Sequence, residues 1–196
     1  MEAQEIHERI EDAGHQRNKR VAVLIAALAA MLAISETGGK GAQLYSMNAN
    51  LEAADTWAFF QAKTIRMTVN RAAADVVEAI AQDAPDPATK ARVEAKVAAF
   101  RDEARRLDSD EQTREGRREL AERAKAAQAR RDHEMARYHN FEYGSAALQL
   151  AIVLASASVI TGVTLLAWTA GGLGLLGTAL SLLGWFAPNL LERFLG

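Results

Sequence analysis

The sequence contains no cysteine, only three prolines, and one long stretch without charge. The absence of cysteine excludes a disulfide framework, a thiolate metal site and a thiol nucleophile. Because the prolines stand only at positions 85, 87 and 188, long uninterrupted helices are expected, and no segment alternates like a strand. A formal net charge of -2 provides no basic face for DNA or RNA, so no nucleic-acid partner is expected.

The stretch without charge runs from Ala146 to Leu191, and after residue 145 only Glu192 and Arg193 are charged. A stretch this long and apolar predicts a pair of membrane-spanning helices within residues 144–196. The glycine-rich segment Ala170–Gly174 is the expected interruption between the two helices. Small residues at helical spacing are predicted to let these helices pack closely in lipid: Ala151, Ala155, Ser158 and Gly162 in the first, and Gly177, Ser181 and Gly184 in the second.

A shorter apolar run near the N-terminus predicts the first membrane helix, within residues 21–42. It follows a polar segment, residues 1–20, whose few apolar residues recur at the spacing of a short amphipathic helix. As a helix, the apolar residues from Val21 to Ser35 span only roughly 22 Å, against about 30 Å of hydrocarbon. A complete crossing therefore needs the residues that follow, Glu36 and Lys40 among them. Basic residues before an apolar run are also typical of a secretory signal peptide, but no convincing cleavage site follows, so an uncleaved anchor is expected.

Glu36 and Lys40 stand four positions apart, so a continuous helix places them on one face with the acidic residue first. Charged side chains at membrane depth are costly unless they are paired, and such a pair is a candidate functional site. The sequence therefore predicts an intramembrane ion pair between Glu36 and Lys40. The alternative is that the first membrane helix ends at Ser35 and both charges lie among the lipid headgroups.

Residues 43–143 are expected to form a long antiparallel helical hairpin with its turn at 83–87. Pro85 and Pro87 lack amide donors and restrict the backbone, so the chain turns there. The second arm is predicted to run unbroken from about Ala88 to beyond Tyr138. Apolar residues recur at the spacing of a coiled-coil seam in both arms: Leu44, Met47, Leu51, Ala54, Ala58, Ile65, Ala72 and Val76 in the first, and Val93, Val97, Phe100, Ala104 and Leu107 in the second.

Folding the hairpin about residues 85 and 86 leaves an aromatic cluster, Trp57, Phe59 and Phe60, opposite a polar stretch near residues 111–114. Exposed apolar clusters usually mark an interaction surface, so these three residues are expected to form an interface with another copy of the chain. The alternative is a shift of a few residues in which the aromatic rings cover one another. The same folding pairs Val76 and Ile80 with Val93 and Val97, Ile65 with Leu107, and Ser35 with Ala136.

The basic residues of the N-terminal segment, Arg9, Arg17, Lys19 and Arg20, favour a cytoplasmic N-terminus. With three crossings, the hairpin then lies on the opposite side of the membrane. The rival topology has a first apolar segment that enters the bilayer without crossing it, which leaves the hairpin cytoplasmic.

Metal-binding and catalytic patterns are sparse. His7, Glu11 and His15 are spaced four apart and could share one helical face, but that segment is polar and exposed, so neither a metal nor another cofactor is expected. No P-loop, dinucleotide-binding glycine motif, zincin signature or nucleophile elbow occurs. An enzyme is therefore not expected.

Four segments, Leu32–Glu36, Gly38–Lys40, Asn50–Ala53 and Trp57–Arg66, resemble an uncharacterised bacterial membrane-protein family, the domain-of-unknown-function family 4337. The resemblance covers most of the chain, and the Trp-Ala-Phe-Phe-Gln-Ala-Lys string is a fairly specific part of it. It implies a multi-pass protein of the bacterial inner membrane. It brings no known activity, ligand or catalytic residue.

Together these patterns predict an all-α membrane protein with three transmembrane helices and a long antiparallel, coiled-coil-like helical hairpin. The expected function is a non-enzymatic, homo-oligomeric scaffold in the lipid bilayer that could recruit an unidentified protein partner. The rival hypothesis is a small channel or transport-related protein that uses the Glu36 and Lys40 pair.

Overall fold

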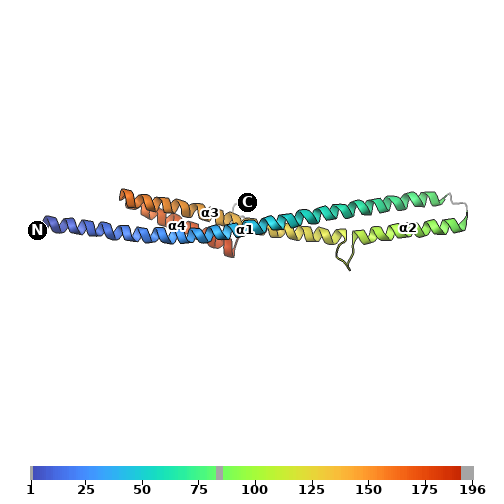
Figure 1. Cartoon of the computed structure of the whole chain (residues 1–196), viewed down its shortest axis with the longest axis horizontal. Helices are drawn as coiled ribbons and strands as arrows, with labels where there is room; N and C mark the ends of the chain where they lie inside the picture. Colours follow the sequence, from blue (N-terminus) through green and yellow to red (C-terminus); the bar gives the residue numbers. More distant parts are fainter. Residues whose placement is uncertain (1, 83–85, 191–196) are drawn as a thin grey trace. The chain divides into compact units, whose positions relative to one another are not determined.

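The computed structural model describes the backbone of residues 2–82 and 86–190, and it describes no side chain of residues 2–15, 17, 81 or 82. Its described part is all-helical, as predicted, with helices α1 (Glu2–Gln82), α2 (Pro87–Asp108), α3 (Arg117–Thr161) and α4 (Thr164–Phe186) (Figure 1). The chain divides into two compact units. We call residues 1–46 with 132–196 the bundle unit, and residues 47–131 the hairpin unit.

Helix α1 contributes to both units without interruption, so the expected boundaries after residues 20 and 42 are not helix ends. Its sequence is rich in alanine, the best helix former, and contains no proline. The predicted amphipathic character of residues 1–20 lies largely outside the residues whose side chains are described.

The bundle unit packs three apolar helices around small residues. Val21 of α1 packs with Ala155 of α3 and Ala170 of α4, and Leu28 of α1 packs with Leu148 of α3. From the start of α1 onward, the residue numbers of its α4 partners increase and those of its α3 partners decrease. The helices α1 and α4 therefore run in the same direction, and α3 runs against both. Figure 1 shows α3 and α4 beside the N-terminal part of α1. These three helices are long and apolar enough to cross a membrane by length and composition.

The turn between α3 and α4 lies at Gly162 and Val163, which corrects the expected interruption at Ala170–Gly174. Gly162 has a φ of 73°, a left-handed conformation that lets a helix end and that glycine adopts without strain. The glycines of the expected interruption instead lie within α4. There Gly174 packs directly against Leu28 of α1, where a β-carbon would overlap the leucine side chain.

Two exposed tryptophans mark the ends of α4. Trp168 and Trp185 are 78% and 52% exposed, and the helix between them rises about 25 Å. Tryptophan is enriched at the two surfaces of a bilayer, and this separation fits a hydrocarbon layer of about 30 Å. The two residues therefore give a scale for depth within the bundle unit.

The hairpin unit packs α1 against α2 and the start of α3. Of the predicted turn at 83–87, residues 83–85 lie outside the described part of the chain. Asp86 caps α2: its carboxylate accepts hydrogen bonds from the backbone N–H of Thr89 at 2.8 Å and from the Thr89 hydroxyl at 2.7 Å. Proline at position 87 suits the first turn of a helix, where the N–H has no helical partner.

The prediction of one unbroken helix from Ala88 to beyond Tyr138 is wrong. Helix α2 ends at Asp108, residues 109–116 form a loop, and α3 begins at Arg117. Asp110 accepts hydrogen bonds from the backbone N–H groups of residues 112 and 113, a turn that short polar side chains favour over helix. Arg114 has a φ of 56°, which a helix does not contain.

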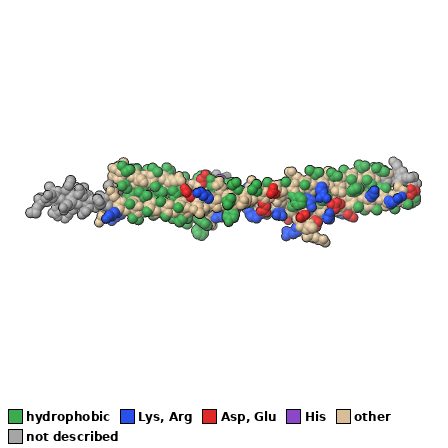
Figure 2. All heavy atoms as spheres, in the orientation of Figure 1, with side chains coloured by type: hydrophobic (Ala, Val, Ile, Leu, Met, Phe, Trp, Pro, Cys, Tyr) green, Lys and Arg blue, Asp and Glu red, His purple; other side chains and the backbone are tan. Residues whose placement is uncertain are grey.

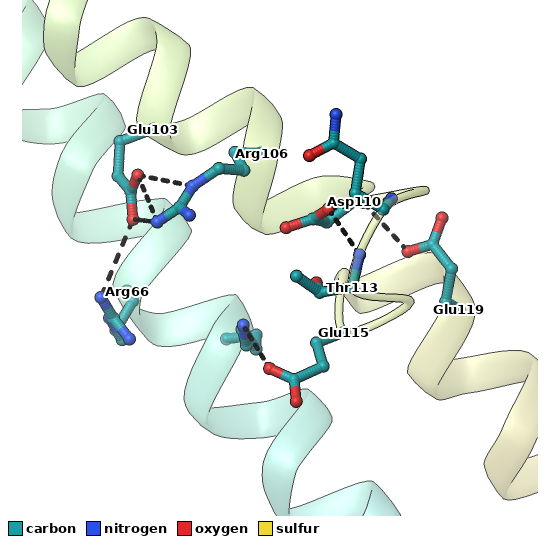
Figure 3. A network of polar contacts seen from close by, with 9 residues as sticks. Arg66, Glu103, Arg106, Asp110, Thr113, Glu115 and Glu119 are labelled. Atoms are coloured by element: carbon teal, nitrogen blue, oxygen red, sulfur yellow. Dashed lines mark hydrogen bonds and ion pairs between the residues drawn. The ribbon is translucent and has the colours of Figure 1, made fainter.

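Glu119 closes this loop from the first turn of α3. Its carboxylate accepts a hydrogen bond from the Ser109 hydroxyl at 2.5 Å. It also accepts one from the backbone N–H of Asp110 at 3.4 Å (Figure 3). Arg117 donates two hydrogen bonds from α3 to Asp108 at the end of α2. The polar residues that interrupt the apolar pattern thus form hydrogen bonds with one another in an ordered loop.

The prediction of which α1 residues face α2 is also wrong. Ile65, Val76 and Ile80 are each more than 60% exposed, whereas Met67 is buried against Leu107. The helix α1 is therefore rotated so that another stripe of residues faces its partners.

Candidate functional site

Helix α1 carries two stripes within the hairpin unit, both with near-heptad spacing. We call the stripe that faces α2 and α3 the inner stripe; it is buried or half-buried. It consists mostly of small and polar residues: Ala49, Ala53, Thr56, Phe60, Lys63, Met67, Asn70, Ala74 and Val77. Small residues at these positions allow helix backbones to approach closely, so the hairpin needs no large apolar seam from α1.

The other stripe, which we call the outer stripe, lies on the opposite side of α1 and is exposed. Two positions along a heptad correspond to about half a turn, which is the offset between the two stripes. The outer stripe carries the larger aliphatic residues. Its members are Met47, Leu51, Ala54, Ala58, Ala62, Ile65, Val69, Ala72, Val76 and Ile80.

Exposure of large apolar side chains in the hairpin unit is confined to α1. Among the described residues of 47–131, every exposed large hydrophobic residue belongs to α1, and all of these but Phe59 belong to the outer stripe. Figure 2 shows hydrophobic side chains along the α1 edge of this unit and charged side chains over the rest. Six of the outer-stripe residues are large and aliphatic. Their complete burial against a partner would contribute on the order of 10 kcal/mol before the costs of association.

The ion pairs of the hairpin unit lie along the sides of the hairpin and not on the outer stripe. Lys63 lies 3.9 Å from Glu115 in the loop (Figure 3), and Arg66 lies 3.8 Å from Glu103 of α2. Further pairs join α1 to its neighbours: Glu78 with Arg101, and Glu52 with Arg123 and Arg130. Such exposed pairs contribute little individually, so they fix register more than stability.

The three residues of the predicted aromatic interface differ in their exposure and contacts. Trp57 and Phe60 are half-buried and meet edge to face, with ring centroids 5.1 Å apart, and the Arg117 guanidinium lies 5.6 Å from the Phe60 ring. Phe59 is 43% exposed, and the Lys63 ammonium lies 5.2 Å from its ring. The rings thus cover one another in part, and their role as an interface stays a prediction.

In the bundle unit, three buried serines join three helices. Ser35 of α1 donates a hydrogen bond to the Phe141 carbonyl at 3.1 Å, and Ser145 of α3 donates to the Ser35 hydroxyl at 3.0 Å. The Ser181 hydroxyl of α4 lies 2.9 Å from that of Ser35 and 2.8 Å from the Gly177 carbonyl. Polar groups within lipid need partners inside the protein, so this serine cluster fixes the heights of the helices relative to one another.

Beside the serine cluster, Phe141 fills a slot made by glycines. A β-carbon at Gly38 would lie 2.8 Å from the ring, one at Gly39 would lie 3.2 Å from the Phe141 β-carbon, and one at Gly184 would lie 3.2 Å from the ring. Phe141 is completely buried and meets Trp185 edge to face at 5.6 Å. Glycine at these positions is therefore a packing requirement, which the sequence pattern alone did not reveal.

The residues predicted to pack the C-terminal helices lie mostly in the core of the bundle unit. All but one are buried: Ala151, Ala155, Ser158, Gly177, Ser181 and Gly184. Gly162 lies instead at the turn between α3 and α4. Gly177 marks a close approach of α3 and α4, since a β-carbon there would lie 2.8 Å from the Gly144 carbonyl oxygen and 2.8 Å from Leu148.

Glu36 and Lys40 are both exposed on α1. The Glu36 carboxylate accepts a hydrogen bond from Gln149 of α3 at 3.4 Å, and within the described part of the chain it forms no salt bridge with Lys40. Both line a groove of about 420 Å³ between α1 and α3, to which Tyr138 and Glu142 also contribute. The intramembrane pairing of the two charges stays a prediction.

Two further polar residues anchor the end of α4. Arg137 donates a hydrogen bond to the Gly184 carbonyl at 3.3 Å, and its guanidinium lies 5.6 Å from the Trp185 ring. The buried Asn140 donates from Nδ2 to the Pro188 carbonyl at 2.8 Å, while its Oδ1 has no hydrogen-bond partner.

Among the residues whose side chains are described, no group of three or more His, Asp or Glu residues could hold a metal ion. The candidate ligands His7, Glu11 and His15 lie outside those residues.

The chain belongs to the family described as a domain of unknown function, DUF4337, whose model matches residues 17–187. The match spans both units, including the serine cluster and the outer stripe. No curated protein and no solved structure gives a significant match.

Proposed function

We propose that the protein is a non-enzymatic membrane scaffold that assembles with copies of itself through the outer stripe of α1. The observation that carries this proposal is the placement of large aliphatic residues on the side of α1 that faces away from α2 and α3. A stripe with heptad spacing matches the surface of another helix, and most soluble assemblies are symmetric homo-oligomers. The assembled hairpins would then present their charged α2 and α3 faces to protein partners.

The proposed location is supported by the bundle unit, whose three helices are long and apolar enough for a multi-pass membrane protein. The bacterial inner membrane is part of the proposal. The basic residues of the N-terminal segment support a cytoplasmic N-terminus. In that topology, three crossings place the hairpin outside the cytoplasm.

Replacement of two exposed outer-stripe residues tests the scaffold. Both copies carry the substitutions, so the double variant Ile65→Ser with Val76→Ser removes four side chains from an interface between two copies. At about 1 to 2 kcal/mol for each on burial, the affinity between copies should fall by roughly 1000-fold or more. Native mass and light scattering in mild detergent would report the mass of the assembly over a range of concentrations.

Met67→Ala provides the matched control on the same helix. Met67 is 4% exposed on the inner stripe, so its loss should lower the melting temperature and leave the mass of the folded assembly unchanged. An outer-stripe variant that keeps the full assembly mass at every concentration would overturn the proposal.

A further inference from the structure

The depth of Glu36 can be placed from the serine cluster. Ser35 contacts Ser181, and Trp185 lies one helical turn beyond Ser181 along α4. Because α1 and α4 run in the same direction, Glu36 lies about three residues, or roughly 4.5 Å, inside the level of the exposed Trp185. Lys40 lies close to that level. Glu36 is therefore on the bilayer side of the interface that Trp185 marks.

Both charges face outward at this depth. Glu36 has a hydrogen bond of 3.4 Å from Gln149, and within the described residues neither Glu36 nor Lys40 has an ion pair. Gln149, also exposed, extends the polar surface further into the apolar part of α3. Charged groups that face lipid without a counter-charge are costly, so this face needs a partner that supplies charge.

The surface around the two charges has the shape of a helix-packing face. Ala33 and Thr37 form an exposed ridge on α1 that leads to Lys40, and the Thr37 hydroxyl is satisfied by the Ala33 carbonyl at 2.8 Å. On one side of the ridge lies the groove that Glu36 lines. On the other lies a mostly apolar groove of about 500 Å³, which Arg137 and Trp185 also line, over Gly41, where a β-carbon would meet nothing within 4 Å. Small ridge residues beside open grooves permit close approach of a second helix in lipid.

We propose that the occupant of this face is a second copy of the chain, with Glu36 of each copy paired to Lys40 of the other. Copies of one membrane protein share their orientation, so a two-fold axis along the membrane normal brings equal residues to equal depth. Glu36 and Lys40 are separated by about 6 Å along α1, which a lysine side chain spans. Each charge then meets its opposite, and the symmetry forms the pair twice.

This inference rests on the proposed self-assembly but assigns a separate contact in the bundle unit. It also fixes which residues each copy contributes. The exchange of charge between copies makes it testable by mixing two variants. Glu36→Lys leaves two lysines on the face, and Lys40→Glu leaves two glutamates, so each variant should repel itself and attract the other.

The chain has no cysteine, so Thr37→Cys supplies a single thiol on the ridge. Oxidation of membranes that contain this variant should give a covalent dimer. Ile160→Cys, which is 86% exposed on α3 away from the ridge, is the matched control and should stay monomeric. In the Thr37→Cys background, each charge variant alone should lower the dimer yield about tenfold, and co-expression of differently tagged copies of both should restore a mixed dimer.

Restoration of the mixed dimer also shows that both charge variants fold. The pairing would be overturned if the dimer yield did not change in the charge variants. It would also be overturned if the mixture formed no mixed dimer while each variant retained its helical circular dichroism. In either case lipid headgroups or water would supply the counter-charge. Ile65→Cys reports the outer stripe separately. A cross-link there without one at Thr37→Cys sinks only this inference, and the converse sinks only the scaffold through the outer stripe.

Discussion

The close contact between α3 and α4 leads to a prediction about two glycines of α4. Gly177 lies where α4 meets α3, and a β-carbon would lie 2.8 Å from the Gly144 carbonyl oxygen and 3.1 Å from the Leu148 backbone nitrogen. Backbone atoms cannot rotate away as a flexible side chain can. Gly177→Ala must therefore push the two helices apart. Gly172 faces open space, with nothing within 4 Å of a built β-carbon.

Both substitutions gain helix propensity, but only one of them adds a packing cost. Alanine favours helix over glycine by about 1 kcal/mol, and this gain applies at both positions. Overpacking costs about 1 to 3 kcal/mol and applies only at Gly177. The difference between Gly177→Ala and Gly172→Ala therefore isolates the packing cost of about 1 to 3 kcal/mol. For a chain of this length that corresponds to roughly 2 to 12 °C in melting temperature.

The assay is thermal unfolding of both purified variants in the same detergent, followed by tryptophan fluorescence and circular dichroism. Gly172→Ala should melt at or slightly above the parent temperature, and Gly177→Ala should melt below it. Equal melting temperatures for the two variants would show that α3 and α4 do not approach closely at Gly177. The packing argument for the glycines of α4 would then fail.

The fold class follows from the sequence because its determinants are local. Charge segregation places the membrane helices, and Pro85 and Pro87 mark the turn region. The α2 seam residues Val97, Ala104 and Leu107 are buried as their spacing predicts, and Leu107 packs with Met67 of α1. Each of these features depends on residues within one or two helical turns.

The orientation of α1 in the hairpin does not follow from hydrophobicity. The outer stripe is the more apolar of the two heptad stripes of α1, so looking for a coiled-coil seam in the sequence selects residues such as Ile65 and Val76. The inner stripe stabilises the hairpin through close backbone approach at residues such as Ala53 and Ala74, 3% and 1% exposed, and this term grows with proximity rather than with apolar area. The choice between the stripes depends on contacts made by the whole chain.

Two missed features have other physical causes. The turn at Gly162 was hidden because several glycines occur nearby, and only the φ at one of them is left-handed. The serine cluster was hidden because Ser35, Ser145 and Ser181 lie in three separate helices. Only Ser181 was predicted to pack the C-terminal helices, and for its size rather than its hydroxyl.

The serine cluster and the inter-helix loop give the remaining predictions. Ser35→Ala should destabilise the bundle unit by about 1 kcal/mol or more, because it removes the hydrogen bonds that join the Ser35 hydroxyl to α3 and α4. Ser156→Ala, which loses only a hydrogen bond to its own helix at Ile152, should be close to neutral in the same melting assay. Burial would raise the pKa of Asp108, but the hydrogen bond from Arg117 and the charges of Arg118 and Arg117 outweigh it and hold the pKa below its ordinary 3.8. A lowered pKa in the folded state contributes stability that is present above pH 3.8 and is lost as pH falls through the folded value. Asp108→Asn should therefore be less stable than the parent chain at neutral pH, and its melting temperature should fall less steeply between pH 7 and pH 2.5. Parallel curves for the two proteins would show that the Asp108 carboxylate does not stabilise the contact between α2 and α3.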